Sequence, residues 1–167
     1  MKAKEPCLKE GTHKVWKFVH QTDFTHQTNI LLGRQCDYEW LSIEDGTITV
    51  KGSNGKGYAW DGCTPKKNFL HITWGNFDGK LKRFKEGDYK PYTYYGSMIH
   101  DVLYQYKRCA PLTRKEADLI FLQLLKEAKF MWANLFYFGV RCFGWYFRGW
   151  KYSSKKAIEL DMSQQNP

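Results

Sequence analysis

The chain has 167 residues, of which 43% are hydrophobic and 17% aromatic, and its formal net charge is +9. This composition excludes an intrinsically disordered chain, because enough apolar side chain is present to bury a core, and the length predicts one domain. The charge is compatible with an anionic membrane surface, with nucleic acid or with simple solubility. Because the Lys and Arg residues are dispersed in pairs rather than gathered in one stripe, nucleic-acid binding is not favoured.

The N-terminus and the cysteines indicate the compartment. No apolar segment with a small-residue cleavage site follows Met1, so the sequence predicts no secretory signal and predicts synthesis in a cytoplasm. The five cysteines are an odd number without C-x-x-C spacing, and we expect reduced thiols. Structural zinc is not expected, because closely spaced Cys or His pairs are missing from the sequence.

The β-rich part is expected at residues 13–62, as a small antiparallel sheet. Residues 15–19 and 38–43 alternate apolar and polar side chains imperfectly. Asp45-Gly46 is typical of a hairpin turn, and it leads into a strand at 47–50.

Between the sheet and the helices, residues 65–93 carry glycines and basic residues without a clear period. We expect an irregular, exposed connection there. The sequence thus predicts one α+β domain at 1–152, with a polar tail at 153–167.

The helical part is expected at 94–148. A first helix is predicted at 95–106 and ends in a turn around Pro111. Thr113 and Glu116 have the spacing of a capping box, which predicts a second helix from there to about residue 129.

A third helix is predicted at 130–147, where the sequence is rich in Phe, Trp and Tyr. Asn134 and Arg141 interrupt the apolar run, so a membrane span is not expected. A buried core helix is the favoured interpretation, with an interfacial amphipathic helix as the alternative.

His100 and Asp118 are the candidate catalytic pair. The turn between the first two helices has its midpoint near Ala110, so an antiparallel pair brings these two side chains to the same level. Tyr104 lies one turn from His100 on the same face, whereas Asp101 points roughly 100° away. If Asp118 accepts a hydrogen bond from one imidazole nitrogen, the other nitrogen is left as a general base.

An ordinary structural role explains the same spacing. Arg114 lies four residues before Asp118 and is placed to pair with it, which would leave His100 as a hydrogen-bonded core residue. Gly96, one turn before His100, is expected to leave room for a substrate or a water above the ring.

The segment 60–65 is the other dense motif. Its Gly and Pro fix a sharp backbone path, and such a loop can present Asp61 and carbonyl oxygens to a hard cation such as Ca²⁺. It is equally typical of a turn that ends a strand. Cys63 adds a thiol that would form a nucleophilic triad with His100 and Asp118 if the three meet.

Four motifs in this order resemble a phage and bacterial family of uncharacterised domains, over roughly residues 57–147. The motifs are Trp60-Asp61-Gly62-Cys63-Thr64, His100-Asp101-x-x-Tyr104, Arg114-x-x-Ala117-Asp118-x-x-Phe121 and Val140-Arg141-x-x-Gly144. The resemblance implies a phage-type domain, but no function.

The middle portion also resembles the core of the phospholipase A2 superfamily, including the domain found in some viral capsid proteins. The resemblance implies that His100 deprotonates a water, that Tyr104 and Asp118 hold His100, and that Asp101 binds Ca²⁺. The chain departs from that family in two ways. The glycine-containing loop lies about 35 residues upstream of the histidine, and Met98-Ile99 stand where paired cysteines usually precede it.

The sequence therefore predicts an α+β hydrolase-like domain that cleaves an ester, in the first instance in a phospholipid, with His100 as general base. A phospholipid membrane surface and other virion proteins are the expected partners. The alternatives are a non-catalytic virion or host-interaction protein and a Cys63-dependent thiol hydrolase.

Overall fold

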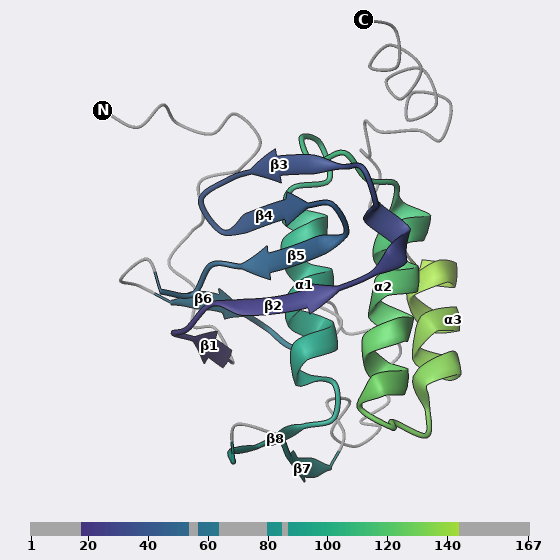
Figure 1. The fold of residues 1–167 in the computed structure, drawn as a ribbon. Coiled ribbons are helices and arrows are strands. Elements are labelled where there is room, and N and C mark those ends of the chain that lie inside the picture. Colours follow the sequence, from purple (N-terminus) through teal and green to yellow (C-terminus); the bar gives the residue numbers. More distant parts are fainter. Residues whose placement is uncertain (1–17, 54–56, 64–79, 85–86, 144–167) are drawn as a thin grey trace, which may run out of the picture.

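The computed structural model describes residues 18–53, 57–63, 80–84 and 87–143. Short antiparallel strands come first and three helices follow, which confirms the α+β prediction (Figure 1). The predicted tail, the segment 15–17, residues 65–79 and 85–86 of the predicted connection, and residues 144–147 of the predicted third helix lie outside the described residues.

The strands form one four-stranded sheet and two small antiparallel pairs. The sheet has the order β2-β5-β4-β3, and the pairs are β1-β6 and β7-β8. The strands are β1 (Phe18–His20), β2 (Phe24–Gln27), β3 (Gln35–Asp37), β4 (Leu41–Glu44), β5 (Thr47–Val50), β6 (Tyr58–Trp60), β7 (Leu81–Arg83) and β8 (Tyr89–Pro91), with a 3-10 turn η1 (Asn29–Leu31) after β2.

The hairpin predicted at Asp45-Gly46 joins β4 to β5 and is confirmed. Both turn residues have positive φ, 40° and 79°, as a tight two-residue hairpin loop requires. The strand predicted at 38–43 is displaced, because the Tyr38 N–H donates to the Leu41 carbonyl at 2.8 Å and closes a turn there. Residues 38–40 therefore belong to the β3–β4 turn.

The expected irregular connection is wrong in its described part. Residues 80–84 and 87–91 contain β7 and β8, which pair with Lys82 opposite Lys90 and Arg83 opposite Tyr89. Each strand has only three residues, which is too short to show a period of two in the sequence.

The helices are α1 (Tyr94–Gln105), α2 (Arg114–Glu127) and α3 (Ala133–Phe143). The predicted capping box opens α2. The Glu116 N–H donates to Thr113 Oγ1 at 3.3 Å, and the Thr113 N–H donates to Glu116 Oε2 at 2.7 Å. This cap fixes where α2 starts, and so fixes the level of every side chain along it.

The main core lies between the four-stranded sheet and the pair α1–α2, which cover one face of it (Figure 1). Ile43, Ile48 and Val50 from the sheet meet Ile99 and Val102 from α1, and all five are fully buried. Burying such side chains is the main favourable contribution to folding. Helix α1 is thereby packed between the sheet and α2.

Helix α3 lies on the outer side of α2, away from the sheet (Figure 1). It packs against α2 through Ala133, Phe136 and Val140, but leaves Leu135 and Phe138 exposed. The interpretation of this segment as a buried core helix is therefore wrong for its outer face. Among the described residues, none of the helices combines the length and the apolar character needed to cross a membrane.

One cysteine departs from the expected reduced state. Cys109 is disulfide-bonded. Cys36, Cys63 and Cys142 are in no disulfide bond.

Candidate functional site

The expected contact between His100 and Asp118 is present. His100 lies in the middle of α1, Asp118 lies in the second turn of α2, and Nε2 of the imidazole is 3.0 Å from Oδ1 of the carboxylate. Asp118 is fully buried, whereas 17% of the His100 side chain is exposed. The capped start of α2 and its antiparallel packing on α1 create this register.

Asp118 is the centre of a network that joins all three helices. Its Oδ1 accepts hydrogen bonds from His100 and, at 2.6 Å, from the Tyr104 hydroxyl. Its Oδ2 accepts a hydrogen bond from Arg141 Nη1 at 3.0 Å, and Arg114 Nε lies 3.5 Å away. A buried carboxylate needs such partners, because it has lost its hydration.

These partners decide the charge of Asp118. Burial opposes ionisation of the carboxyl group, but the hydrogen bonds from His100 and Tyr104, with the nearby positive groups, lower its pKa below the ordinary value of 3.8. Asp118 is therefore a carboxylate at neutral pH. In turn, burial and then the charge of Asp118 raise the pKa of Tyr104, so its hydroxyl stays protonated and donates.

An ionised Asp118 also fixes the proton on His100. A carboxylate only accepts hydrogen bonds, so the nitrogen that faces it, Nε2, must carry the hydrogen. Within the described part of the chain the other nitrogen, Nδ1, has no hydrogen-bond partner. In the neutral ring, Nδ1 then presents a lone pair, which is what a general base needs.

Two aromatic rings hold the imidazole in place. The ring centroids of Tyr104 and Phe121 lie 4.2 Å and 4.8 Å from that of His100. The room expected above Gly96 is not there. A Cβ at that position would lie 3.2 Å from Leu125 Cδ2 and 3.4 Å from Phe121 Cδ2, because these side chains fill the space that the glycine leaves. Gly96 serves the close approach of α1 and α2 instead.

The ordinary alternative, an Arg114–Asp118 pair, is present at the same time, but Arg114 is not the nearest cation. Arg141 of α3 is closer to the carboxylate, and Arg114 Nη2 donates to the Arg141 carbonyl at 2.6 Å. Sequence reasoning did not assign Arg141 to the site. The signal for it was a lone arginine in an otherwise apolar helix, which more often marks a buried ion pair than an interruption.

The two acids expected to bind metal have other surroundings. Asp101 faces Tyr58 of β6, whose hydroxyl donates to Oδ2 at 3.4 Å, and Gln105 Nε2 donates to the same oxygen at 3.2 Å. Asp61 follows β6 and is half-buried. Ca²⁺ takes six to eight oxygen ligands, whereas these two groups approach Asp101 as hydrogen-bond donors in this structure.

Consistently, the described residues contain no group of three or more His, Cys, Asp or Glu side chains that could hold a metal ion. The expectation of calcium stays a prediction without support from these residues.

Cys63 packs at the edge of the small cluster formed by Phe121, Leu125 and Ala133. Phe121 also contacts the His100 ring, so the thiol and the imidazole share a neighbour. No hydrogen bond joins Cys63 to His100 within the described residues. The structure thus brings His100, Tyr104 and Asp118 together as expected and adds Arg114 and Arg141. Among the described residues, no hydrogen bond or ion pair joins His100 or Asp118 to Asp101, Asp61 or Cys63.

Comparisons with protein-family models, with curated proteins and with solved structures gave no match. The two family resemblances of the sequence therefore stay predictions, and function is argued from the site alone.

Proposed function

We propose that this chain is a hydrolase that uses His100 as its general base, with an ester as substrate and phospholipid as the first substrate class to test. The observation that carries the proposal is the His100–Asp118 pair. A fully buried, ionised carboxylate holds Nε2 at 3.0 Å, while the ring keeps partial exposure to solvent.

The chemistry needs only a water and the imidazole. Nδ1 takes a proton from the water as its oxygen attacks the ester carbonyl, and the tetrahedral intermediate forms. The carbon–oxygen bond to the alcohol then breaks, and the proton on Nδ1 passes to the departing alkoxide. Asp118 stabilises the imidazolium that exists between the two proton transfers. No step runs through a metal ion.

The test is release of fatty acid from vesicles of mixed phosphatidylglycerol and phosphatidylcholine, with a soluble short-chain ester assayed alongside. Each assay is run with Ca²⁺ and with a chelator. We expect His100→Gln to reduce hydrolysis by at least about 100-fold, because a positioned general base contributes that much. Hydrolysis by His100→Gln at the parent rate, or no hydrolysis of either substrate by the parent, would contradict the proposal.

His26→Gln is the matched control. His26 is also a buried histidine that faces a carboxylate of α2, Glu127, at 3.7 Å. Because it lies on the other side of α2, against the sheet, its replacement should leave hydrolysis unchanged. Cys63→Ser distinguishes the thiol hydrolase, which would lose activity in that variant while the proposed enzyme would keep it.

A non-catalytic interaction protein is the second candidate, and one observation favours it. Asp118 receives hydrogen bonds from residues of both α1 and α3, which is what a purely structural clamp between helices would show. This candidate predicts that His100→Gln lowers the melting temperature and that the parent has no hydrolytic activity to lose.

A further inference from the structure

One end of the molecule exposes large apolar side chains on two separate segments. The β7–β8 hairpin exposes Leu81 and Tyr89, at 64% and 68%. The turn between α2 and α3 exposes Met131 and Trp132, at 83% and 54%. Exposed apolar residues are ordinary when scattered singly, but a group of them indicates an interaction surface.

The two segments are packed together and form one surface, which we call the hairpin end: residues 80–84, 87–91 and 126–132. Lys82 Nζ of β7 donates to the Ala128 carbonyl at 2.8 Å, and the rings of Tyr92 and Phe130 lie 5.9 Å apart. In Figure 1 the hairpin and the α2–α3 turn occupy the same end of the molecule.

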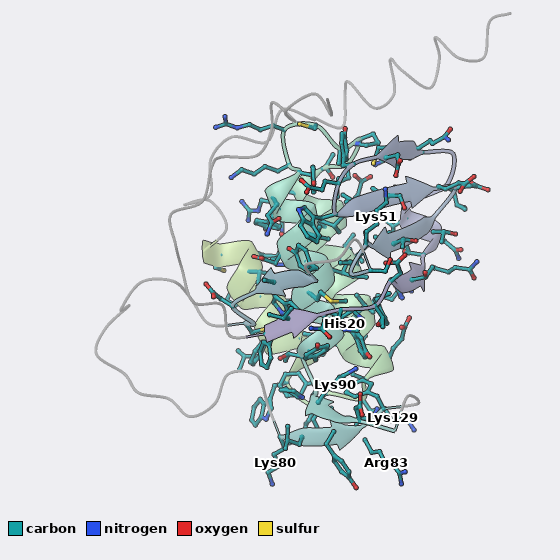
Figure 2. The ribbon with its side chains drawn as sticks, turned by 90° about the vertical axis from the view of Figure 1, so that its left-hand side faces the viewer. His20, Lys51, Lys80, Arg83, Lys90 and Lys129 are labelled. Carbon is teal, nitrogen blue, oxygen red and sulfur yellow. The ribbon has the colours of Figure 1, made fainter. Side chains whose placement is uncertain are left out.

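The hairpin end is also strongly basic. It carries six cations, Lys80, Lys82, Arg83, Lys90, Lys126 and Lys129, against two acids, Asp88 and Glu127. Figure 2 shows Lys80, Arg83, Lys90 and Lys129 grouped at this end, well away from Lys51 on the sheet. Apolar side chains surrounded by cations form a pattern that differs from both a core and an ordinary solvated surface.

Helix α3 extends the apolar surface along its outer face. Leu135, Phe138 and Cys142 are exposed, and their spacing of three and four residues places them on one stripe of α3. The exposed Met131 lies in the turn just before this helix. Helix α3 contains no Asp or Glu, and its cation, Arg141, bonds to Asp118. The stripe therefore faces solvent without a charge on it.

From this arrangement we infer that the hairpin end and the outer stripe of α3 dock on an anionic phospholipid bilayer. Lysines and arginines near such a surface are attracted to acidic headgroups, while Trp, Leu, Met and Phe side chains enter the boundary between headgroups and acyl chains. The inference deepens the proposed function, because it names the surface on which the hydrolase would meet its substrate.

Charge and side-chain type argue against two other occupants. A second copy of the chain docked through this same face would bring the cations of the two copies together, which is unfavourable without acids between them. Single-stranded nucleic acid is bound by aromatic rings that stack on bases. Tyr89, Trp132 and Phe138 offer such rings, but Leu81, Met131 and Leu135 do not, whereas a bilayer takes up both kinds of side chain. Both occupants remain outcomes of the test.

The test is co-sedimentation of the full chain with vesicles of phosphatidylcholine alone and of phosphatidylcholine with an equal part of phosphatidylglycerol. We expect binding to the anionic vesicles that is at least about tenfold tighter than to the neutral ones and that weakens as salt is raised. The double variant Lys80→Glu/Arg83→Glu should lose at least about tenfold in affinity for anionic vesicles. The double variant Leu81→Ser/Met131→Ser should lose a similar factor, because its apolar side chains no longer enter the bilayer.

Matched controls come from other surfaces of the molecule. Arg108→Glu/Lys115→Glu reverses two exposed charges near the α1–α2 turn, at the opposite end of α2, and Leu32→Ser removes an exposed leucine next to the sheet. Both should bind anionic vesicles as the parent does. All variants change exposed side chains, so we expect melting temperatures close to that of the parent.

Three results would overturn the inference. The first is no vesicle binding by the parent at low salt, and the second is equal loss of binding in the control variants. The third is a different partner for the same surface: either the chain self-associates, or it binds a single-stranded oligonucleotide more tightly than vesicles, and the variants Lys80→Glu/Arg83→Glu and Leu81→Ser/Met131→Ser abolish that binding.

The His100→Gln variant separates the docking proposal from the proposed hydrolysis. If it binds vesicles and neither it nor the parent hydrolyses lipid, docking stands and the chemistry fails; if the parent hydrolyses a soluble ester without binding vesicles, the chemistry stands and docking fails.

Discussion

Helix α2 carries two polar clusters, and each pairs a histidine with a carboxylate. Near its start, Asp118 faces His100 of α1 at 3.0 Å; near its end, Glu127 faces His26 of β2 at 3.7 Å. The burial is opposite in the two pairs. Asp118 is fully buried beneath a partly exposed histidine, whereas Glu127 is 52% exposed and the His26 ring is buried.

This difference separates a candidate site from a structural pair. The buried charge of Asp118 is satisfied by donors on α1 and α3, and its pKa is lowered although burial opposes ionisation. His26 has a pKa lowered by burial, only partly offset by Glu127, and its Nε2 has no hydrogen-bond partner in the described part of the chain. A buried carboxylate beneath a partly exposed imidazole is the arrangement that the proposed general base requires, whereas the second pair keeps a neutral histidine in the core.

The largest effect on stability is expected when the carboxylate of Asp118 is removed, because the His26 pair has no equally buried charge. Asp118→Ala leaves Arg141, Arg114 and Tyr104 without their shared acceptor, so we expect a loss of about 3–5 kcal/mol in the free energy of unfolding. Urea unfolding measures it. Asp118→Asn keeps the shape of the side chain and loses its charge, so its free energy of unfolding should lie between those of the parent and of Asp118→Ala. A loss below about 1 kcal/mol for Asp118→Ala would mean that the network does not hold the helices together.

The contribution of Asp118 should also depend on pH. Because its pKa in the folded chain lies below the ordinary 3.8, the stabilisation is complete above pH 3.8 and is lost as the pH falls through the folded-state pKa. The difference in unfolding free energy between the parent and Asp118→Asn should therefore shrink in acid. A difference that grows in acid would contradict the assigned charge.

A smaller effect is expected from Tyr104→Phe. The variant keeps the ring that packs on His100 and removes the hydroxyl that donates to Asp118 at 2.6 Å. Losing one hydrogen bond to a buried charge should cost about 1–3 kcal/mol in unfolding free energy, again measured in urea. Hydrolysis should fall far less than in His100→Gln; an equal fall would assign Tyr104 a direct part in the reaction.

The His26 pair should respond to pH in its own range. Its folded-state pKa lies below 6.5, so the unfolded chain binds the extra proton first, and stability declines as the pH falls from about 6.5 toward the folded-state pKa. His26→Gln should flatten that part of the profile of melting temperature against pH. An unchanged profile would show that His26 is not kept neutral by burial.

The smallest effect is expected from Gly96→Ala. Alanine gains about 1 kcal/mol in helix propensity, but its Cβ would lie 3.2 Å from Leu125 Cδ2, so a neighbour must shift by a few tenths of an ångström. The net change in unfolding free energy should stay within about 1 kcal/mol. A gain well above that would mean that the space beside Gly96 is open after all.

The His100–Asp118 contact was predictable because it depends on local information: a capping box, a turn and helix geometry set the register. Arg141 was missed because it comes from a third helix whose packing no local pattern fixes. The prediction that Asp101 binds metal rested on the family resemblance. Sequence spacing could not show that the hydroxyl of Tyr58, from β6, lies against the Asp101 carboxylate. The strands β7 and β8 have three residues each and are too short to leave a period. Helix α3 was predicted as a core helix because its exposed stripe is as apolar as its buried one.

The most direct measurement is the protonation of the His100 ring, read from the two-bond and three-bond couplings between its nitrogens and ring hydrogens by NMR at neutral pH. The account predicts a hydrogen on Nε2, facing Asp118, and a bare Nδ1, with this preference lost in Asp118→Asn. A hydrogen on Nδ1 of the neutral ring, with Nε2 bare, would contradict the assignment of His100 as a general base.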